Sequence, residues 1–487
     1  MDSLQVAIAV QKVRAALRAR EVQVDYDRIT PQLFYASPSV NKLARSLHVL
    51  VNGDRQADVN GTDDRHVRLQ EVLDRYLVGL DKVVPSKQKE TDNPVVILTG
   101  STGSLGSYLL ATLLSSPKIS KVICLNRTTD AETRQRASHK QRGLDIAWDD
   151  HSRNQKRVEF LTADLSKPDL GLSKGTYTRL LSEASALIHN AWKVDFNHTI
   201  ETFEKSNIAG VRHLIDFSAR CKYRAPILFV SSISSCLNWI GTHPEERVPE
   251  AVIHDLDAPE KLGYGESKYI GERLLEAFTT SCGIPSAVLR VGQIAGPVRS
   301  PSGVWNVREW FPSLVASSKY LGLLPRSLGT MGAISWIPVD VLAVIMVQLL
   351  EAIQGKDPAA AVAAAAVHVY NLVNLRVTTW WTLLPTVQSQ LGGPAKIRTV
   401  SLKDWTDALE RSAGDNHGYV VAENPGVKLL EFFKLLVRGK TSMSMSDAGT
   451  ARQEYQVARL MRDSPEAARL EAVSAEWIKV WMQQWDF

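Results

Sequence analysis

Residues 95–106 read VVILTGSTGSLG, and residues 107–114 continue with the apolar spacing of a helix. A buried strand, a glycine turn and a helix in this order are typical of the first βα unit of a dinucleotide-binding domain. The glycines allow a sharp turn and a close approach to phosphates, and the free N–H groups of the first helical turn attract an anion. An ordinary βα turn in an unrelated α/β protein is the alternative interpretation.

The next apolar run, residues 121–125, ends at Asn126 and Arg127. Many NAD enzymes carry an acidic residue at this point, which binds the ribose hydroxyls. A guanidinium group instead suits a 2′-phosphate, so Arg127 favours NADPH as the cofactor. Arg134 is a second, weaker candidate for the same phosphate.

A second motif lies at residues 264–268, where Tyr264 and Lys268 are four positions apart and share one helix face. Upstream, the apolar run 225–230 ends at Ser231 and Ser232, so a hydroxyl is expected at a strand end. Ser232, Tyr264 and Lys268 could form a carbonyl-reducing triad, in which Lys268 lowers the pKa of Tyr264 and can bond the nicotinamide ribose, and Ser232 donates to the substrate oxygen. Alternatively, the serines merely end a strand and Tyr264 is a half-buried surface residue.

With these motifs in place, the chain resembles an extended short-chain dehydrogenase/reductase. Three further segments, residues 188–197, 289–296 and 336–340, narrow the resemblance to the thioester reductase domains of fungal nonribosomal-peptide-synthetase-like enzymes, carboxylic acid reductases and α-aminoadipate reductases. The resemblance runs from about residue 92 to the C-terminus. It implies NADPH-driven release of a carrier-bound acyl thioester as an aldehyde, or further to the alcohol, with an adenylation domain upstream.

The residues and the resemblance together predict a catalytic set and a cofactor-binding set. The catalytic set is Ser232, Tyr264 and Lys268. The predicted cofactor contacts are Thr99, Gly100, Thr102, Gly103, Ser104, Leu105, Gly106, Arg127, Arg134, Asp164, Leu165, Asn190, Ala191, Asn207, Tyr264, Lys268, Gly292 and Ile294.

The N-terminus carries a second resemblance, to a phosphopantetheine carrier domain. Residues 1–5 read MDSLQ, which is similar to the Asp-Ser-Leu of such carriers and implies phosphopantetheine attachment at Ser3. An amphipathic helix at residues 6–17 and a segment at 33–44 that resembles the closing helical part of a carrier agree with this. The first carrier helix is absent, so we expect a partial carrier. A plain helix N-cap at Asp2-Ser3 is the alternative.

Composition narrows the class of protein further. The chain has 487 residues, 44% apolar content and a formal charge of +5, so it can bury a large core and form more than one domain, and nucleic acid is not an expected partner. Four scattered cysteines suggest neither a metal site nor a disulfide framework, His189 and His198 are interpreted as structural, and no signal peptide or membrane span is expected. We therefore expect a cytoplasmic protein.

The predicted fold class is α/β, with a Rossmann-type doubly wound parallel sheet, a smaller C-terminal substrate domain and a partial helical carrier domain in front. The expected domains are residues 1–50, a partial carrier; 51–93, a linker with a short helix at 67–80; 94–296, the NADP-binding domain; and 297–487, mainly the substrate-binding domain. Tryptophans of the last region could line an acyl or aryl pocket, although most such aromatics are core. Strands are predicted at residues 95–99, 122–125, 158–162, 186–189, 227–230 and 287–291.

Three other functions remain open at this point. An extended short-chain enzyme could act on free sugar nucleotides or ketones, and a fatty acyl-CoA reductase would take its thioester from coenzyme A. A non-catalytic Rossmann protein that senses NADPH is the third, although it would not need Tyr264 and Lys268.

Overall fold

The structure is a computed structural model of the whole chain. The structure describes residues 3–35, 37, 39–52, 57–80, 91, 93–144, 146, 149–150, 155–196, 198–300, 302–354, 367–413, 423–438 and 454–485.

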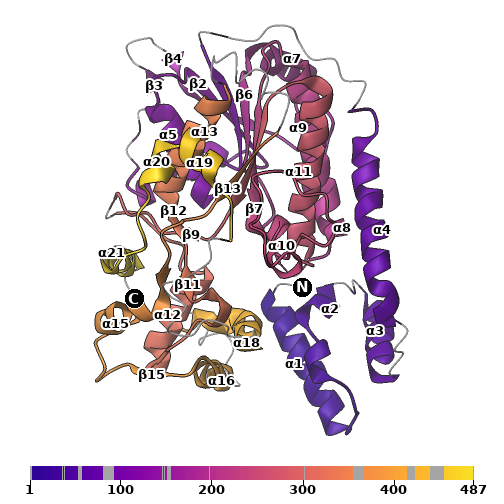
Figure 1. Cartoon of the computed structure of the whole chain (residues 1–487), viewed down its shortest axis with the longest axis vertical. Coiled ribbons are helices and arrows are strands. Elements are labelled where there is room, and N and C mark those ends of the chain that lie inside the picture. The colour runs from indigo at the N-terminus through magenta and orange to yellow at the C-terminus, as the bar shows by residue number, and fades with distance from the viewer. Residues whose placement is uncertain are drawn as a thin grey trace.

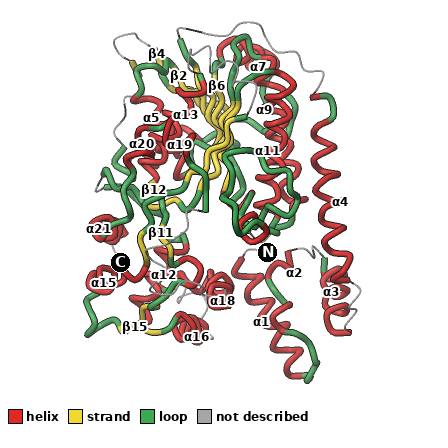
Figure 2. The backbone as a smooth tube through the Cα atoms, in the orientation of Figure 1, coloured by secondary structure: helices red, strands yellow, loops and turns green. Residues whose placement is uncertain are grey.

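A seven-stranded parallel sheet forms the centre of the molecule, with the strand order β13-β8-β7-β6-β1-β2-β5 (Figures 1 and 2). Its strands are β1 (Val95–Thr99), β2 (Lys121–Asn126), β5 (Val158–Thr162), β6 (Ala186–His189), β7 (Ile227–Ser232), β8 (Ser286–Val291) and β13 (His368–Leu372). The strand order reverses beside β1, so the edge where the glycine turn begins is the expected ligand crevice of a doubly wound sheet. The predicted Rossmann-type fold class is confirmed.

Helices cover both faces of this sheet, as the almost entirely buried strands require (Figure 1). One face packs against α5 (Ser104–Ser115), α13 (Val339–Ile353), α19 (Ala458–Asp463) and α20 (Pro465–Arg469). The opposite face packs against α4 (Ala57–Leu77), α7 (Lys174–Glu183), α9 (Ala209–Arg220) and α11 (Gly263–Cys282). Shorter helices, α6 (Ala131–Gln141), α8 (Ile200–Phe203) and α10 (Trp239–Thr242), lie in the connections.

The C-terminal region divides between the sheet and a separate subdomain. The subdomain has its own core, built from α12 (Trp310–Leu321), α15 (Trp380–Gln390), α16 (Leu402–Ser412), α18 (Leu430–Arg438), α21 (Ala475–Trp485) and the short pair β10 (Leu323–Pro325) and β15 (Arg398–Val400). Four more short strands pair nearby: β9 (Ile294–Ala295) with β12 (Ile337–Pro338), and β11 (Ala333–Ile334) with β14 (Thr378–Thr379). By contrast, α13 and β13 return to the Rossmann layers, so residue 296 does not end that unit.

The tryptophans of this region are mainly core. Trp305, Trp336, Trp380 and Trp481 are at most 3% exposed and pack on one another or on Phe311. They hold the subdomain together through edge-to-face contacts. These buried tryptophans are therefore not available to line a substrate pocket. In the same region, Trp310 and Trp477 are half-buried and Trp381 is exposed.

The N-terminal segment forms a small helical module with its own apolar core. It contains α1 (Ser3–Ala19), α2 (Pro31–Tyr35) and α3 (Val40–Asn52). The module contacts both larger parts of the chain. The Tyr35 ring lies 4.9 Å from His198, and Arg14 lies 3.6 Å from Glu431 on α18. Helix α1 begins at Ser3, but the Ser3 side chain and Asp2 lie outside the described residues, so phosphopantetheine attachment there stays a prediction.

The segment expected to be a linker contains a long helix that belongs to the Rossmann core. The predicted helix at 67–80 begins earlier, at Ala57, and residues 60–64, predicted as a polar linker, are helical. Leu69, Val72 and Leu73 are buried against α9 and α11, so burial of this apolar face overrides the weak local helix propensity. The alanine-rich run 359–366, expected as a loop or helix, lies outside the described residues, as do residues 81–90.

The buried face of α4 predicts that its apolar residues stabilise the Rossmann domain. Leu73→Ala should lower the free energy of unfolding by about 2–5 kcal/mol, because the side chain is 1% exposed and its removal leaves a cavity. Val67→Ala on the same helix is the control, since Val67 is 57% exposed and should change stability by no more than about 0.5 kcal/mol. Urea unfolding measures both, and equal stabilities of the two variants would contradict this packing.

Candidate active site

The predicted glycine turn closes tightly between β1 and α5. Gly100 has a φ of +70°, and a Cβ placed there would lie 2.8 Å from the Ala191 Cα. A Cβ on Gly106 would lie 2.0 Å from the Gly100 carbonyl oxygen. Helix α5 begins after Gly103 with no side-chain cap, so the N–H groups of its first turn are left for a ligand. Thr102 and Ser104 are half-buried at this turn and Leu105 is buried beneath it.

The Thr99 hydroxyl joins the ends of β1 and β6. Its Oγ1 accepts hydrogen bonds from the Asn190 N–H at 3.1 Å and the Ala191 N–H at 3.0 Å, and lies 2.9 Å from Nδ1 of His189. With both acceptor positions used, the hydroxyl donates its proton to Nδ1, which places the imidazole proton on Nε2. The Asn190 side chain donates to the Gly100 carbonyl at 3.1 Å. These residues therefore line the glycine turn, the cradle between β1 and α5, on the side of β6.

The end of β2 also fits a dinucleotide. The Asn126 Oδ1 accepts from the Ser101 hydroxyl at 3.2 Å, while its buried Nδ2 has no hydrogen-bond partner among the described residues. Such an unpaired donor beside an uncapped helix N-terminus fits a polar ligand. Arg127 follows directly and is exposed, as is Arg134 on α6. The residues present thus fit a phosphate-bearing nicotinamide cofactor.

The remaining predicted cofactor residues lie at the same edge or behind it. Asp164 is exposed after β5, and its carboxylate accepts from the Ser166 N–H and hydroxyl, which lowers the Asp164 pKa. Leu165 offers its carbonyl to His213 at 2.8 Å. Asn207 is buried in a π-helical turn, and its Oδ1 accepts from Ser206. Gly292 and Ile294 follow β8, in the connection toward the C-terminal subdomain.

The structure brings Tyr264 and Ser232 together. Tyr264 lies in the first turn of α11 and is 8% exposed, and its hydroxyl is hydrogen-bonded to Ser232 at the end of β7. The Ser232 Oγ accepts from the Ser234 N–H at 3.2 Å, so its own proton is directed to the phenol. A Cβ on Gly263 or Gly265 would lie within 2.6 Å of neighbouring backbone, so only glycine fits on either side of the tyrosine.

Burial controls the acidity of this phenol. It raises the pKa of Tyr264 to about 12, an increase that the Ser232 hydrogen bond opposes and the nearby Glu260 carboxylate reinforces. The predicted lowering of the Tyr264 pKa by Lys268 is not seen, because burial dominates this pKa. Burial also raises the pKa of Glu260, whose side chain is hydrogen-bonded to Ser234.

Lys268 lies in an aromatic cage and binds a backbone carbonyl. Its Nζ donates to the Val230 carbonyl at 2.6 Å and lies 3.9 Å from the Trp192 ring centroid and 4.8 Å from that of Phe229. The distance to the Tyr264 ring centroid is 5.9 Å. Full burial lowers the Lys268 pKa well below its usual value, against an opposing effect of Glu272. The cation–π contacts with Trp192 and Phe229 offset part of this desolvation.

A buried ion pair supports the floor of the site. Arg290 on β8 and Glu272 on α11 meet at 2.7 Å, with side chains 0% and 1% exposed. The Glu272 Oε1 also lies 2.5 Å from the Ser231 hydroxyl and 2.6 Å from the Ser235 hydroxyl. Arg290 donates further to the carbonyls of residues 249 and 251. The carboxylate thus ties the end of β7 and the turn after it to α11.

The surface around Tyr264 is partly apolar. The Phe196 ring lies 4.9 Å from the Tyr264 ring and is 47% exposed, and Val194 on the same loop is 68% exposed.

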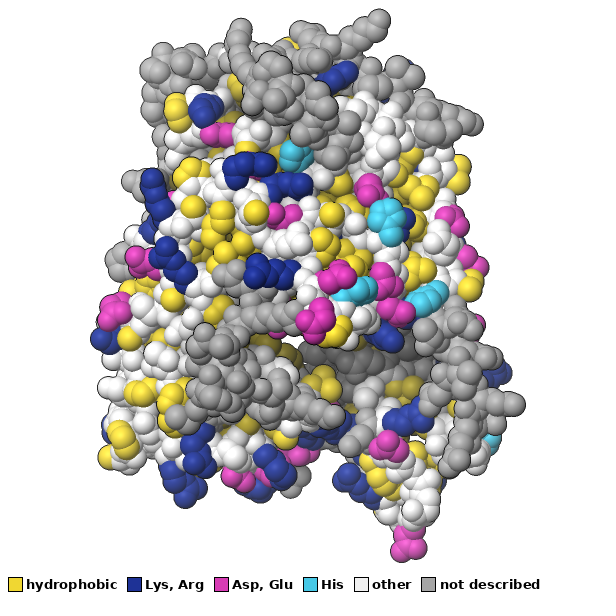
Figure 3. All heavy atoms as spheres, in the orientation of Figure 1, with side chains coloured by type: hydrophobic (Ala, Val, Ile, Leu, Met, Phe, Trp, Pro, Cys, Tyr) yellow, Lys and Arg dark blue, Asp and Glu magenta, His cyan; other side chains and the backbone are white. Residues whose placement is uncertain are grey.

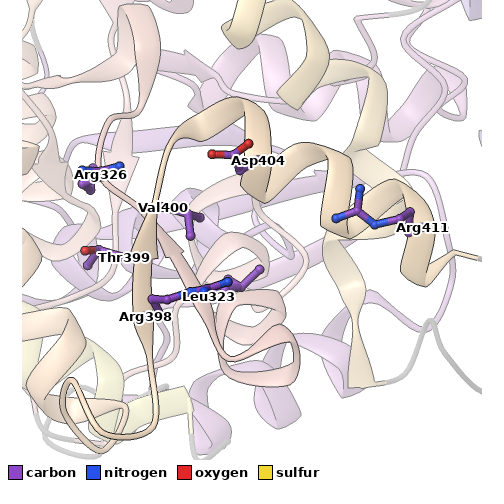
Figure 4. Close-up of a pocket in the computed structure, with 7 residues that line it drawn as sticks. All are labelled: Leu323, Arg326, Arg398, Thr399, Val400, Asp404 and Arg411. Atoms are coloured by element: carbon purple, nitrogen blue, oxygen red, sulfur yellow. The ribbon is translucent and has the colours of Figure 1, made fainter.

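A hollow of about 440 Å³ elsewhere in the molecule, in the C-terminal subdomain, is lined by Leu323, Arg326, Arg398, Thr399, Val400, Asp404 and Arg411 (Figure 4). None of these residues belongs to the triad. On the face drawn in Figure 3, Lys and Arg side chains are interspersed with Asp and Glu.

Comparison with known proteins identifies the family. Residues 98–346 match the NAD-binding family described as male sterility protein, and the chain belongs to this family. It is 37% identical over 491 residues to a carboxylic acid reductase of Neurospora crassa, an alignment that covers 100% of this chain and 44% of the relative. It is 32% identical to an adenylate-forming reductase of Serpula lacrymans, again over 99% of this chain and 44% of the relative. The chain thus spans less than half the length of these curated relatives.

Solved reductase domains share the fold. The reductase domain of a nonribosomal peptide synthetase from Mycobacterium tuberculosis superposes with a TM-score of 0.64 at 21% identity, covering 86% of this chain and 98% of that one. A thiolation-reductase di-domain from an archaeal nonribosomal peptide synthetase superposes with a TM-score of 0.60 at 16% identity, covering 99% of this chain and 90% of that one. The protein is therefore an oxidoreductase-family member with an NAD(P)-binding Rossmann domain. Across the described residues, the helices are too short or too polar to cross a bilayer.

Several site residues were missed from the sequence. The sequence gives no role to Glu260 or Glu272, and Trp192 and Phe196 belong to the segment 188–197 that only the family resemblance singles out. Trp192 follows β6 by three residues, and this place after a predicted strand is a signal that could have identified it. Nothing local points to Glu260 or Glu272, whose importance comes from partners on other elements.

His189 should make the protein sensitive to acid. Burial lowers the pKa of His189 to about 3, well below the value near 6.5 of an unfolded histidine. As the pH falls below about 6.5, His189 binds a proton in the unfolded chain but not in the folded one. The free energy of unfolding therefore falls by up to about 1.4 kcal/mol per pH unit.

The measurement is the free energy of unfolding between pH 6.5 and 4.5 for the wild type and for His189→Asn. We expect a shallower pH dependence in the variant. His139, whose pKa burial also lowers, is present in both proteins and cancels in the difference. Equal slopes would contradict a neutral buried His189.

Proposed function

We propose that this chain uses NADPH to reduce an acyl thioester to an aldehyde and a free thiol. The observation that carries the proposal is the hydrogen-bonded pair of Ser232 and Tyr264, at the same sheet edge as the uncapped α5 cradle. The family match, and the relatives that are carboxylic acid and adenylate-forming reductases, support it. Arg127, exposed at the end of β2, supports the choice of NADPH over NADH.

In this proposal, Ser232 and Tyr264 both donate hydrogen bonds to the thioester carbonyl oxygen. The cofactor, when bound, supplies hydride to the carbonyl carbon. The raised Tyr264 pKa of about 12 keeps the phenol protonated at neutral pH, so it is ready to act as the acid. The Tyr264 Oη proton passes to the carbonyl oxygen, which completes a hemithioacetal.

The second half of the reaction breaks the C–S bond. The tyrosinate takes back the hydroxyl proton, the carbonyl re-forms as an aldehyde, and the thiolate leaves and is protonated by water. A thiol with a pKa near about 8.5 leaves far more readily than an alcohol, so the hemithioacetal collapses. Lys268, held by Trp192 and the Val230 carbonyl, keeps a donor beside the tyrosine and can reach a ribose hydroxyl.

We assign an apolar acyl or aryl group to the substrate. Phe196 beside the Tyr264 ring, and Val194 on the same loop, give the site an exposed apolar rim that an acyl chain would cover. The substrate arm is proposed to be phosphopantetheine, on Ser3 or on a partner carrier, loaded by an adenylation domain. The four cysteines are buried and none of them forms a disulfide, which suits a reducing compartment, and we place the reaction in the cytoplasm.

Removal of the phenol tests the assignment. Tyr264→Phe should lower kcat for reduction of a pantetheine thioester by about 10²- to 10⁴-fold, because the general acid is lost, while NADPH binding changes little. NADPH oxidation and the mass of the product measure both effects. Coenzyme A thioesters and free ketones in the same assay test the other reductase functions.

Tyr269→Phe is the matched control, because Tyr269 is a buried tyrosine on the same helix that donates to the His254 carbonyl at 3.0 Å. It should leave kcat within about 3-fold of the wild type. Undiminished turnover in Tyr264→Phe would remove Tyr264 from the mechanism. Tight NADPH binding without oxidation by any thioester would favour a sensor instead.

A further inference from the structure

A buried ion pair links the helix that precedes the Rossmann domain to the catalytic helix. Arg65 on α4 donates through Nε to the Glu266 Oε1 on α11 at 2.7 Å, and the two side chains are only 7% and 6% exposed. Glu266 lies between Tyr264 and Lys268 in the sequence, in the first turn of α11. The pair therefore acts on the turn that carries the proposed acid.

The rest of the Arg65 guanidinium binds the loop that leads into α11. Its Nη1 donates to the Leu256 carbonyl at 2.8 Å and lies 3.4 Å from the Asp257 carboxylate, and its Nη2 lies 3.5 Å from the Pro259 carbonyl. The next residue along this loop is Glu260, which affects the pKa of Tyr264. One planar fork thus fixes both the loop and the helix that flank the phenol.

Helix α4 is itself held firmly enough to act as a support. Its apolar face is buried in the same core cluster as α11, as described above. At its C-terminal end, Arg212 of α9 donates to the Tyr76 carbonyl at 2.6 Å and the Val78 carbonyl at 2.7 Å. Arg75 of α4 pairs with Glu204. Helix α4 runs alongside α9 and α11 at one side of the molecule (Figure 1).

We propose that Arg65 is a positioning residue for the reductase: it sets the first turn of α11 and the 256–260 loop, and so holds the Tyr264 hydroxyl against Ser232. The segment before residue 94 then contributes to turnover as well as connecting a carrier. This inference rests on the proposed role of Tyr264. Its physical basis is that a displacement of about 1 Å at a reacting group costs about 10²-fold in rate. The glycine turn of the proposed cofactor site lies at a different strand end, after β1.

The test uses the full chain with three substitutions and one control. Arg65→Gln removes the positive charge. Arg65→Lys keeps a charge for Glu266 but lacks the forked guanidinium that reaches the loop carbonyls. Arg65→Gln/Glu266→Gln replaces the ion pair with two amides. Arg68→Gln is the control, because Arg68 lies on the same helix in an exposed pair with Glu201 at 3.7 Å. The readouts are kcat, KM for a pantetheine thioester, NADPH affinity and Tm.

We expect Arg65→Gln to lower kcat about 10- to 100-fold, with KM and NADPH affinity within about 3-fold of the wild type. Arg65→Lys should fold and lose about 3- to 10-fold in kcat. The double variant should recover most of the Tm lost in Arg65→Gln, because no buried charge is left unpaired, but not kcat. Arg68→Gln should match the wild type.

Two results would overturn the inference. One is a wild-type kcat in Arg65→Lys, and the other is recovery of kcat in parallel with Tm in the double variant, which would mark Arg65 as a stability residue only. A wild-type chain inactive on thioesters would instead refute the proposed function, so the two failures are distinguishable.

Discussion

The fully buried pair of Arg290 and Glu272 is the interaction on which the site depends. Removing two charges from water is costly, and the cost is recovered only if nearly every donor and acceptor has a partner. Here the carboxylate meets Ser231 and Ser235 as well as the guanidinium, and the guanidinium also reaches two loop carbonyls. This network can close in only one arrangement of β7, β8 and α11, so it fixes the strand end that carries Ser232 relative to the helix that carries Tyr264.

Helix α11 is therefore held by two arginines from different elements. Arg290 reaches it from the sheet, and Arg65 reaches it from α4. Between these anchors, Tyr264 is dehydrated and stays protonated, and Lys268 is held beside aromatic rings. In the proposed reaction, Tyr264 donates to the same substrate carbonyl oxygen as Ser232. A neutral phenol can act there as an acid, whereas a phenolate has no proton to give. The activity we propose thus follows from burial, with the ammonium as a neighbour and not the source of acidity.

The sequence predicted the parts of the fold that local pattern controls. Six strands of the sheet were expected within two residues, because each is a short apolar run bounded by turn residues. β13 (His368–Leu372) was missed, since its place beside β8 is set by a partner about 80 positions earlier. Spacing predicted that Ser232, Tyr264 and Lys268 lie near one another, but not the contacts of Lys268 with Trp192 and the Val230 carbonyl. Arg65 and Glu266 are 201 positions apart, and no local signal joins them.

The most direct test of the account follows the transferred hydrogen. NADPH carrying deuterium at the transferable position of the nicotinamide C4 is incubated with the full chain and an acyl pantetheine thioester, and the products are analysed by mass spectrometry. We expect an aldehyde that is one mass unit heavier, together with an equal amount of free pantetheine thiol. An unlabelled product, or release of the free acid with no NADPH consumed, would contradict it.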